Sequence, residues 1–126
     1  MDSLRELTSL HKALADETRL QMLALLFEFP ELCVCHFEMV LGITQSKASR
    51  HLRYLLHAGL LADRREGVWM YYRLAENMST ARRLALDVLR QSLPPGLIES
   101  LRQRMAAERC LVCEPNRGCE PKQEAS

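Results

Sequence analysis

The sequence lacks an apolar run long enough to cross a membrane, because a bilayer-spanning helix needs about 20 consecutive apolar residues. Its apolar stretches, such as residues 22–27, are far shorter. The first residues also lack the basic and then apolar pattern of a signal peptide, so we expect a cytoplasmic protein with no membrane partner. Glycine and proline number only five each in 126 residues, which excludes a collagen-like or loop-rich chain. Aromatic residues make up 6%, so we expect a mainly leucine core and a largely helical fold.

Features of a catalytic site are also missing. No glycine-rich phosphate loop, pair of acid–base carboxylates or nucleophile–base pair stands out, and we therefore expect no enzymatic activity. A Cys-x-x-Cys oxidoreductase is the enzymatic alternative, but its motif belongs after a strand in a βαβ unit. Here Cys110 and Cys113 follow a helical, polar segment near the end of the chain.

Charge is unevenly distributed, although the net charge is only +1. Residues 1–40 hold three Lys or Arg against seven Asp or Glu, residues 41–90 hold nine against four, and residues 91–126 hold five of each. The middle of the chain is therefore its basic part. A local basic patch is typical of a nucleic-acid-binding surface, although short basic runs also occur on ordinary solvated faces.

Hydrophobic periodicity and turn residues predict a series of helices interrupted by a hairpin. Helices are predicted over residues 3–15, 18–29, 32–41, 46–58, 80–93 and 97–109, and hairpin strands over residues 60–65 and 68–74. Asp16, Ser46 and Ser79 are the predicted N-caps, and Gly42 is the predicted C-cap of the third helix. The third and fourth helices form a helix-turn-helix, and the hairpin after them makes it a winged helix.

The predicted fold class is therefore mainly α with a small β-hairpin, in the order α-α-α-α-β-β-α. Residues 1–93 are predicted to form a winged helix-turn-helix domain for DNA binding and dimerisation. Residues 94–126 are predicted to form a C-terminal extension, with a short helix over 97–109 and then a flexible tail that contains cysteines. The first helix and the helix at 80–93 carry apolar stripes without another partner, so we expect a homodimer. Two-fold symmetry then predicts an inverted repeat in double-stranded operator DNA.

The fourth predicted helix has the side chains of a DNA-reading helix. Small and polar donors fill its first turn, where such a helix meets base edges in the major groove. Residues expected to face the bases are Gln45, Ser46, Ser49 and Arg50, and those expected at phosphates are Lys47, Arg53, Arg64 and Arg65. His51 has two open interpretations, a contact with DNA or a packed structural histidine. A surface helix with solvated charges is the alternative, which the hairpin and its own arginines make less favoured.

Three stretches of the sequence together resemble the ArsR/SmtB metalloregulators, and more narrowly their arsenical-resistance members. They are Glu31-Leu32-Cys33-Val34-Cys35, Ser46-x-x-Ser49-Arg50-His51-Leu52-x-x-Leu55, and Gly59-Leu60-Leu61-x-Asp63-Arg64-Arg65-x-Gly67-x-Trp69-x-Tyr71-Tyr72-Arg73-Leu74. Residues 13–20 also fit, and the resemblance covers about residues 5–90. It implies a homodimeric winged-helix repressor that occupies its operator when unliganded and leaves when a metal binds.

Cys33 and Cys35 are the candidate sensor thiols, at the start of the predicted helix over residues 32–41. Residues i and i+2 of a regular helix point about 200° apart, so both thiols can hold one small ion only if the first turn distorts or unwinds. Ion binding is then coupled to loss of the DNA-competent pose. Two buried core cysteines are the alternative. Soft thiolates select soft ions, and the resemblance implies As(III) or Sb(III) as the inducer, with no permanently bound cofactor.

A third sulfur ligand is missing from its expected place. In the best-known members of the resembling family a cysteine lies three residues after the second, where this chain has Glu38. Cys110, Cys113 and Cys119 supply further thiols. Three interpretations are open: one of them completes the paired site from either subunit, the three form a separate soft-metal site, or they have no role. The alternative functions are a sensor of Cd, Pb or Zn, and a thiol-redox switch.

Overall fold

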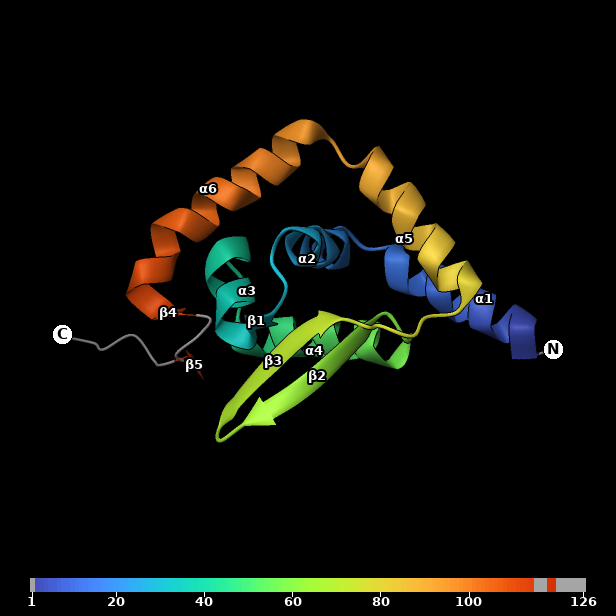
Figure 1. Ribbon diagram of the computed structural model, residues 1–126, viewed down its shortest axis with the longest axis horizontal. Helices are drawn as coiled ribbons and strands as arrows, with labels where there is room; N and C mark the ends of the chain where they lie inside the picture. Colours follow the sequence, from blue (N-terminus) through green and yellow to red (C-terminus); the bar gives the residue numbers. More distant parts are fainter. Residues whose placement is uncertain (1, 115–117, 120–126) are drawn as a thin grey trace.

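The computed structural model describes residues 2–114 and 118–119, with side chains described over residues 3–107. Its elements are α1 (Asp2–Leu14), α2 (Glu17–Glu28), β1 (Leu32–Cys33), α3 (Val34–Leu41), α4 (Gln45–His57), β2 (Leu61–Glu66), β3 (Trp69–Leu74), α5 (Thr80–Ser92), α6 (Pro95–Val112), β4 (Cys113–Glu114) and β5 (Gly118–Cys119). Figure 1 shows α2 near the centre, α5 and α6 arched over it, and the β2–β3 hairpin on the other side. The predicted order of four helices, a hairpin and a further helix is confirmed, and the fold is a mainly helical winged helix-turn-helix.

Most helix ends follow from residues that satisfy free backbone groups. Asp16 is the N-cap of α2, where its carboxylate accepts a hydrogen bond from the Arg19 backbone N–H at 3.0 Å. The Ser79 hydroxyl caps α5 in the same way, and Gly42 is the C-cap of α3. These three predictions are confirmed.

The predicted N-cap of α4 is wrong by two residues. Thr44, not Ser46, is the N-cap, and its hydroxyl accepts a hydrogen bond from the Lys47 N–H at 3.2 Å. Thr44 has the extended backbone of an N-cap, so Gln45 is the first helical residue. Ser46 therefore lies within the first turn, where its hydroxyl is exposed.

The segment before α3 is extended, although the sequence predicts a helix from Leu32. Strand β1 pairs antiparallel with β3, so that Leu32 lies opposite Tyr72 and Cys33 opposite Tyr71. The three-stranded sheet has the order β1-β3-β2. The edge of β3 offers backbone groups that these two residues satisfy, and α3 begins only at Val34. The first helix of the helix-turn-helix is therefore tied to the sheet at its N-terminus.

The wing is the β2–β3 hairpin. Its strands pair antiparallel from Leu61 opposite Leu74 to Glu66 opposite Trp69. Gly67 has a φ of 63° in the two-residue turn, as the predicted hairpin requires. The hairpin prediction is confirmed, with each strand beginning one residue later than expected.

Helix α6 packs along α3 and shares the main hydrophobic core (Figure 1). It begins at Pro95, which suits a first helical turn because the missing N–H has no partner there. Leu101 and Met105 are buried in that core, and Arg104 Nη1 donates to the Val40 carbonyl at 2.8 Å. The helix is thus longer at both ends than the predicted 97–109. None of the helices in the described part of the chain is long and apolar enough to span a bilayer.

Candidate DNA-binding surface and thiol site

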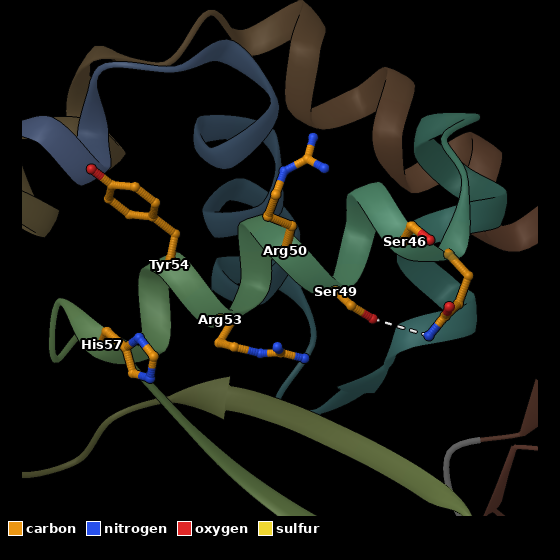
Figure 2. A pocket seen from close by; sticks show the side chains of 7 residues that line it. Ser46, Ser49, Arg50, Arg53, Tyr54 and His57 are labelled. Atoms are coloured by element: carbon orange, nitrogen blue, oxygen red, sulfur yellow. Dashed lines mark hydrogen bonds between the residues drawn. The ribbon is translucent and has the colours of Figure 1, made fainter.

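The outer side of α4 is a shallow, open surface of polar side chains. Its lining residues are Gln45, Ser46, Ser49, Arg50, Arg53, Tyr54 and His57. Figure 2 shows these side chains spread along the helix, with Gln45 Nε2 donating to Ser49 Oγ at 3.0 Å. Hydrogen-bond donors and cations on one helix face are what contact with base edges and phosphates requires. The structure thus brings five of the nine sequence-predicted DNA contacts onto one surface, and Lys47 is exposed in the first turn of the same helix.

Tyr54 and His57 also line this surface, and the sequence analysis missed them. Their spacing of four and seven residues from Arg50 places them on the same helix face, which is the signal that could have identified them. Tyr54 is 42% exposed. The Arg19 guanidinium carbon lies 4.1 Å from the centroid of its ring, which fixes the ring against the core. The tyrosine hydroxyl is a further donor for phosphate oxygens.

His51 lies on the opposite, buried side of α4 and is 8% exposed. Its Nδ1 is 3.0 Å from Nη1 of Arg19, which also donates to the backbone carbonyls of Ala13 and Lys12. Because guanidinium is only a donor, Nδ1 is the acceptor and the neutral ring carries its proton on Nε2. Burial lowers the pKa of His51, although the Asp16 carboxylate opposes this shift. Of its two open interpretations, the geometry favours the packed structural histidine.

The two wing arginines differ in their surroundings. Arg64 Nε and Nη2 donate to the Glu31 carboxylate at 2.9 Å, and Nη1 donates to Glu66 Oε1 at 2.7 Å. These hydrogen bonds, that with Glu31 foremost, raise the pKa of Arg64, and its guanidinium lies 4.5 Å from the centroid of the Tyr71 ring. Arg65 is exposed, and its side chain leaves the other face of the strand. A phosphate contact by Arg64 remains a prediction. For a bidentate contact, the guanidinium must give up its two hydrogen bonds to Glu31 and donate them to the phosphate.

Cys33 and Cys35 are joined as a disulfide in the structure. The expectation that their sulfurs point apart is wrong, because Cys33 is not helical. It is the N-cap of α3, with extended backbone at φ −90° and ψ 166°, whereas Cys35 lies in the first turn. An extended residue before a helix turns its side chain back toward that first turn, so the two sulfurs meet without any unwinding. Cys33 and Cys35 are therefore close enough in the fold for both sulfurs to reach one ligand.

His36 is a third donor at this site that the sequence analysis missed. It occupies the third helical position, and its Nδ1 accepts a hydrogen bond from the Cys33 backbone N–H at 3.1 Å. Its ring is buried at 3% exposure. Spacing of three residues between an N-cap and a polar side chain is the capping-box signal that could have revealed it.

Among the described side chains, no third sulfur joins Cys33 and Cys35. Glu38 lies outside the group of donors formed by the pair and His36, and burial raises the pKa of its carboxyl. The backbone places Cys110 within α6 and pairs Cys113 with Cys119 across β4 and β5. Their side chains lie outside the described residues, so the three interpretations of these thiols stay predictions. Among the described side chains, the soft ligands that suit a trivalent metalloid are therefore the two sulfurs of Cys33 and Cys35, which contact each other.

Comparison with known sequences identifies related regulators. Residues 16–63 match the family model described as "Bacterial regulatory protein, arsR family". An "Arsenical resistance operon repressor" of Escherichia coli (strain K12) is 51% identical over 69 residues, 55% of this chain and 59% of the relative. One of the same name from Bacillus subtilis (strain 168) is 41% identical over 71 residues, 56% of this chain and 68% of the relative. The chain spans about half the length of two further arsenic-resistance regulators, from Pseudomonas putida.

Solved structures agree with the fold. The homodimeric winged helix-turn-helix DNA-binding domain of Mb0332 from Mycobacterium bovis matches with a TM-score of 0.61 and 31% identity, over 71% of this chain and 80% of that one. The AntR antimony-specific transcriptional repressor matches with a TM-score of 0.57 and 27% identity, over 79% of this chain and 83% of that one. In each case about four fifths of the solved chain is matched, so the likeness covers most of each solved structure.

Proposed function

This chain belongs to the arsR family of bacterial regulatory proteins, and from that premise we propose that it represses transcription and responds to trivalent metalloids. It binds operator DNA as a homodimer and dissociates when As(III) or Sb(III) is held by the thiolates of Cys33 and Cys35. One observation carries the proposal. The two sulfurs are in contact at the N-terminus of α3, the helix that precedes α4, the proposed recognition helix. Reduced thiols persist in the cytoplasm, where such a regulator meets its operator.

The DNA-binding part rests on α4. Its outer face combines the donors Gln45 and Ser49 with the cations Arg50 and Arg53. Such a helix reads bases with its first turns and holds phosphates with its flanking cations. In a two-fold dimer the two copies of α4 enter successive major grooves, so the operator is an inverted repeat with half-sites about one helical turn apart.

The dimer part rests on apolar side chains that the single chain leaves in solvent. Leu4 and Leu7 of α1 are 64% and 40% exposed, and Leu84 and Val88 of α5 are 58% and 65% exposed. These two helices lie next to each other on one side of the molecule (Figure 1). A second copy with the same face buries both stripes, as a self-complementary two-fold interface requires. The homodimeric state of the similar Mb0332 domain supports this arrangement.

The proposed response to a metalloid follows from the position of Cys33, which links β3 to α3. Its backbone pairs with β3 of the wing, and it is also the N-cap of α3. When bound, a metalloid supplies covalent bonds to thiolate sulfur, and Cys33 and Cys35 hold it. Any shift of Cys33 therefore acts on the wing and on the helix-turn-helix together. The free energy of ligand binding is coupled to DNA affinity to the extent that the DNA-bound pose disfavours this shift.

Fluorescence anisotropy tests the proposal directly. The reduced protein is mixed with labelled DNA from upstream of its own gene and titrated with arsenite at fixed salt. We expect binding that arsenite abolishes, and a Cys33→Ser variant that binds DNA but is not released. Wild-type binding that resists arsenite but is lost with cadmium shows that another thiophilic ion is the inducer, and contradicts the metalloid assignment.

A thiol-redox switch is the second candidate, and the bonded Cys33 and Cys35 sulfurs favour it. Two thiols lose two electrons and two protons to a peroxide-type oxidant as the disulfide forms. The same anisotropy assay separates the two functions. Release of DNA by peroxide without arsenite, reversed by a dithiol reductant, indicates the switch, whereas stable binding in both oxidation states excludes it.

A further inference from the structure

Arg64 on strand β2 is held by two carboxylates, although it is a predicted phosphate contact of the wing. Its Nε and Nη2 donate to the two carboxylate oxygens of Glu31 at 2.9 Å, and its Nη1 donates to Glu66 Oε1 at 2.7 Å. Carboxylate and phosphate both accept two parallel hydrogen bonds from one guanidinium. Glu31 therefore occupies the donors that a DNA phosphate needs for a bidentate contact. We propose that Glu31 is an internal competitor of DNA phosphate for Arg64 and thereby lowers operator affinity.

The fold brings Glu31 to Arg64 across a separation of 33 residues in the sequence. Glu31 directly precedes β1, and β1 pairs with β3, with Leu32 opposite Tyr72. Strand β3 lies between β1 and β2, the strand that carries Arg64. The order of the sheet therefore places this carboxylate within reach of the wing arginine.

The ring of Tyr71 supports the guanidinium without using its N–H groups. Tyr71 lies opposite Arg64 in the register of the hairpin, and the guanidinium carbon is 4.5 Å from the centroid of the ring. Tyr71 is 2% exposed, so packing holds its ring in place. An arginine that is stacked on an aromatic face keeps its donors available in the plane of the guanidinium. Arg64 can therefore exchange one acceptor for another while it stays on the wing.

The three charged side chains are open to solvent, which makes this exchange feasible. The Arg64 side chain is 42% exposed, and those of Glu31 and Glu66 are 26% and 63% exposed. Water solvates a carboxylate that leaves the guanidinium, so the loss of an exposed ion pair costs little free energy. Binding of a DNA phosphate also releases condensed counterions, which an internal carboxylate does not. The phosphate therefore displaces Glu31, but the operator is bound less tightly than it would be without this carboxylate.

Neutralisation of Glu31 tests the proposal, which rests on the proposed DNA-binding function but not on the metalloid response. The reduced protein is titrated at fixed salt against labelled DNA from upstream of its own gene. We expect Glu31→Gln to bind this DNA at least about threefold more tightly than the wild type. Asp63→Asn is the matched control, because it removes an equal charge from the opposite face of β2. Binding by Glu31→Gln that is no tighter than binding by Asp63→Asn overturns the proposal.

Arg64→Ala identifies the group through which Glu31 acts. If Arg64 holds a phosphate, this variant binds more weakly, and the slope of log affinity against log salt falls in magnitude by about one per subunit. In the Arg64→Ala background, Glu31→Gln should gain no more affinity than Asp63→Asn does. An unchanged salt slope in Arg64→Ala, or an equal gain from Glu31→Gln in both backgrounds, overturns the proposal. Urea denaturation checks that every variant is folded.

Failure of the proposed function gives a different result in the same assay. If arsenite leaves the wild type on its DNA while Glu31→Gln binds more tightly only when Arg64 is present, the competition stands and the metalloid response is wrong. If arsenite releases the wild type but Glu31→Gln gains no affinity, the proposed function stands and the competition is wrong. A wild type that does not bind this DNA contradicts both.

Discussion

The guanidinium of Arg19 lies 3.0 Å from Nδ1 of His51, on the buried side of α4. The same guanidinium donates to the carbonyls of Ala13 and Lys12 at the C-terminal end of α1, at 2.8 Å and 3.0 Å. One buried side chain therefore connects the helix that carries part of the proposed dimer face to the helix that carries the proposed DNA face. Arg19 fixes the angle between them through four contacts, including the one with the Tyr54 ring.

Replacement of Arg19 by methionine should destabilise the protein strongly. It leaves the carbonyls of Lys12 and Ala13 without this donor, and each buried unpaired polar group costs about 1–3 kcal/mol. We therefore expect Arg19→Met to lower the free energy of unfolding by about 3 kcal/mol, measured by urea denaturation at fixed protein concentration. Arg90→Met is the control, because Arg90 is exposed and its guanidinium carbon lies 4.4 Å from the centroid of the Phe27 ring, and the substitution should cost less than about 1 kcal/mol. Similar losses in both variants would contradict this role of Arg19.

Stability should fall on mild acidification because of His51. Burial lowers the pKa of His51 below its ordinary value of about 6.5. Below that pH the unfolded state binds a proton that the folded state does not, so the free energy of unfolding decreases; above it both states are neutral and His51 contributes no pH dependence. His51→Asn keeps an acceptor near the Nδ1 position and cannot titrate, so its urea midpoint should depend less on pH. Identical pH profiles for His51→Asn and the wild type would assign the titration elsewhere.

Local patterns in the sequence were sufficient to predict most of the fold. Asp16 and Ser79 mark helix starts because a short polar side chain before an apolar period caps free N–H groups. Gly67 indicates the hairpin turn, because it can adopt positive φ and is followed by the strand-favouring residues Val68 and Trp69. Strand β1 could not be predicted in this way. Its two residues are extended because they pair with β3, a contact between segments that periodicity within one segment does not encode.

The same long-range pairing explains why the thiol site was only partly predictable. The spacing of Cys33 and Cys35 identified the pair, but the helix assumed there placed the sulfurs apart. Pairing with β3 holds Cys33 out of the helix and brings the sulfurs together. Similarly, the basic sequence of α4 was sufficient to predict Arg50 as a DNA contact, whereas Arg19, the hydrogen-bond partner of His51, comes from α2 and is visible only in the fold.

A charge on the apolar face of α5 should prevent dimerisation. Val88 is 65% exposed and lies one turn from Leu84, so Val88→Glu places a carboxylate in the centre of the proposed interface, where burial without a partner is costly. We expect sedimentation equilibrium to show a monomer where the wild type is a dimer. Val68→Glu is the matched control, because Val68 is 81% exposed at the turn of the wing. A dimeric Val88→Glu protein would show that the interface lies on another face.

Loss of the Arg50 side chain should weaken specific DNA binding. Arg50 projects from the open face of α4 in Figure 2, where it can contact a base edge or a phosphate. We expect Arg50→Ala to reduce operator affinity by about 1–3 kcal/mol in anisotropy titrations at fixed salt. Arg102→Ala removes an equal charge from α6, where Arg102 is paired with Glu28, and should leave affinity unchanged. If both variants lose affinity equally, net charge rather than the α4 face determines binding.

Gly59 should be far less tolerant of a methyl group than Gly67, although both have positive φ, 82° and 63°. A Cβ on Gly59 lies 2.6 Å from Arg82 Nε, which itself donates to the Ala58 carbonyl, whereas a Cβ on Gly67 meets nothing within 4 Å. The left-handed backbone costs about 1–2 kcal/mol at either position. Gly59→Ala should therefore lower the free energy of unfolding by more than Gly67→Ala in urea denaturation, because it also displaces the guanidinium. In an Arg82→Ala background this excess should vanish, and an excess that persists would place the steric conflict in the backbone rather than at Arg82.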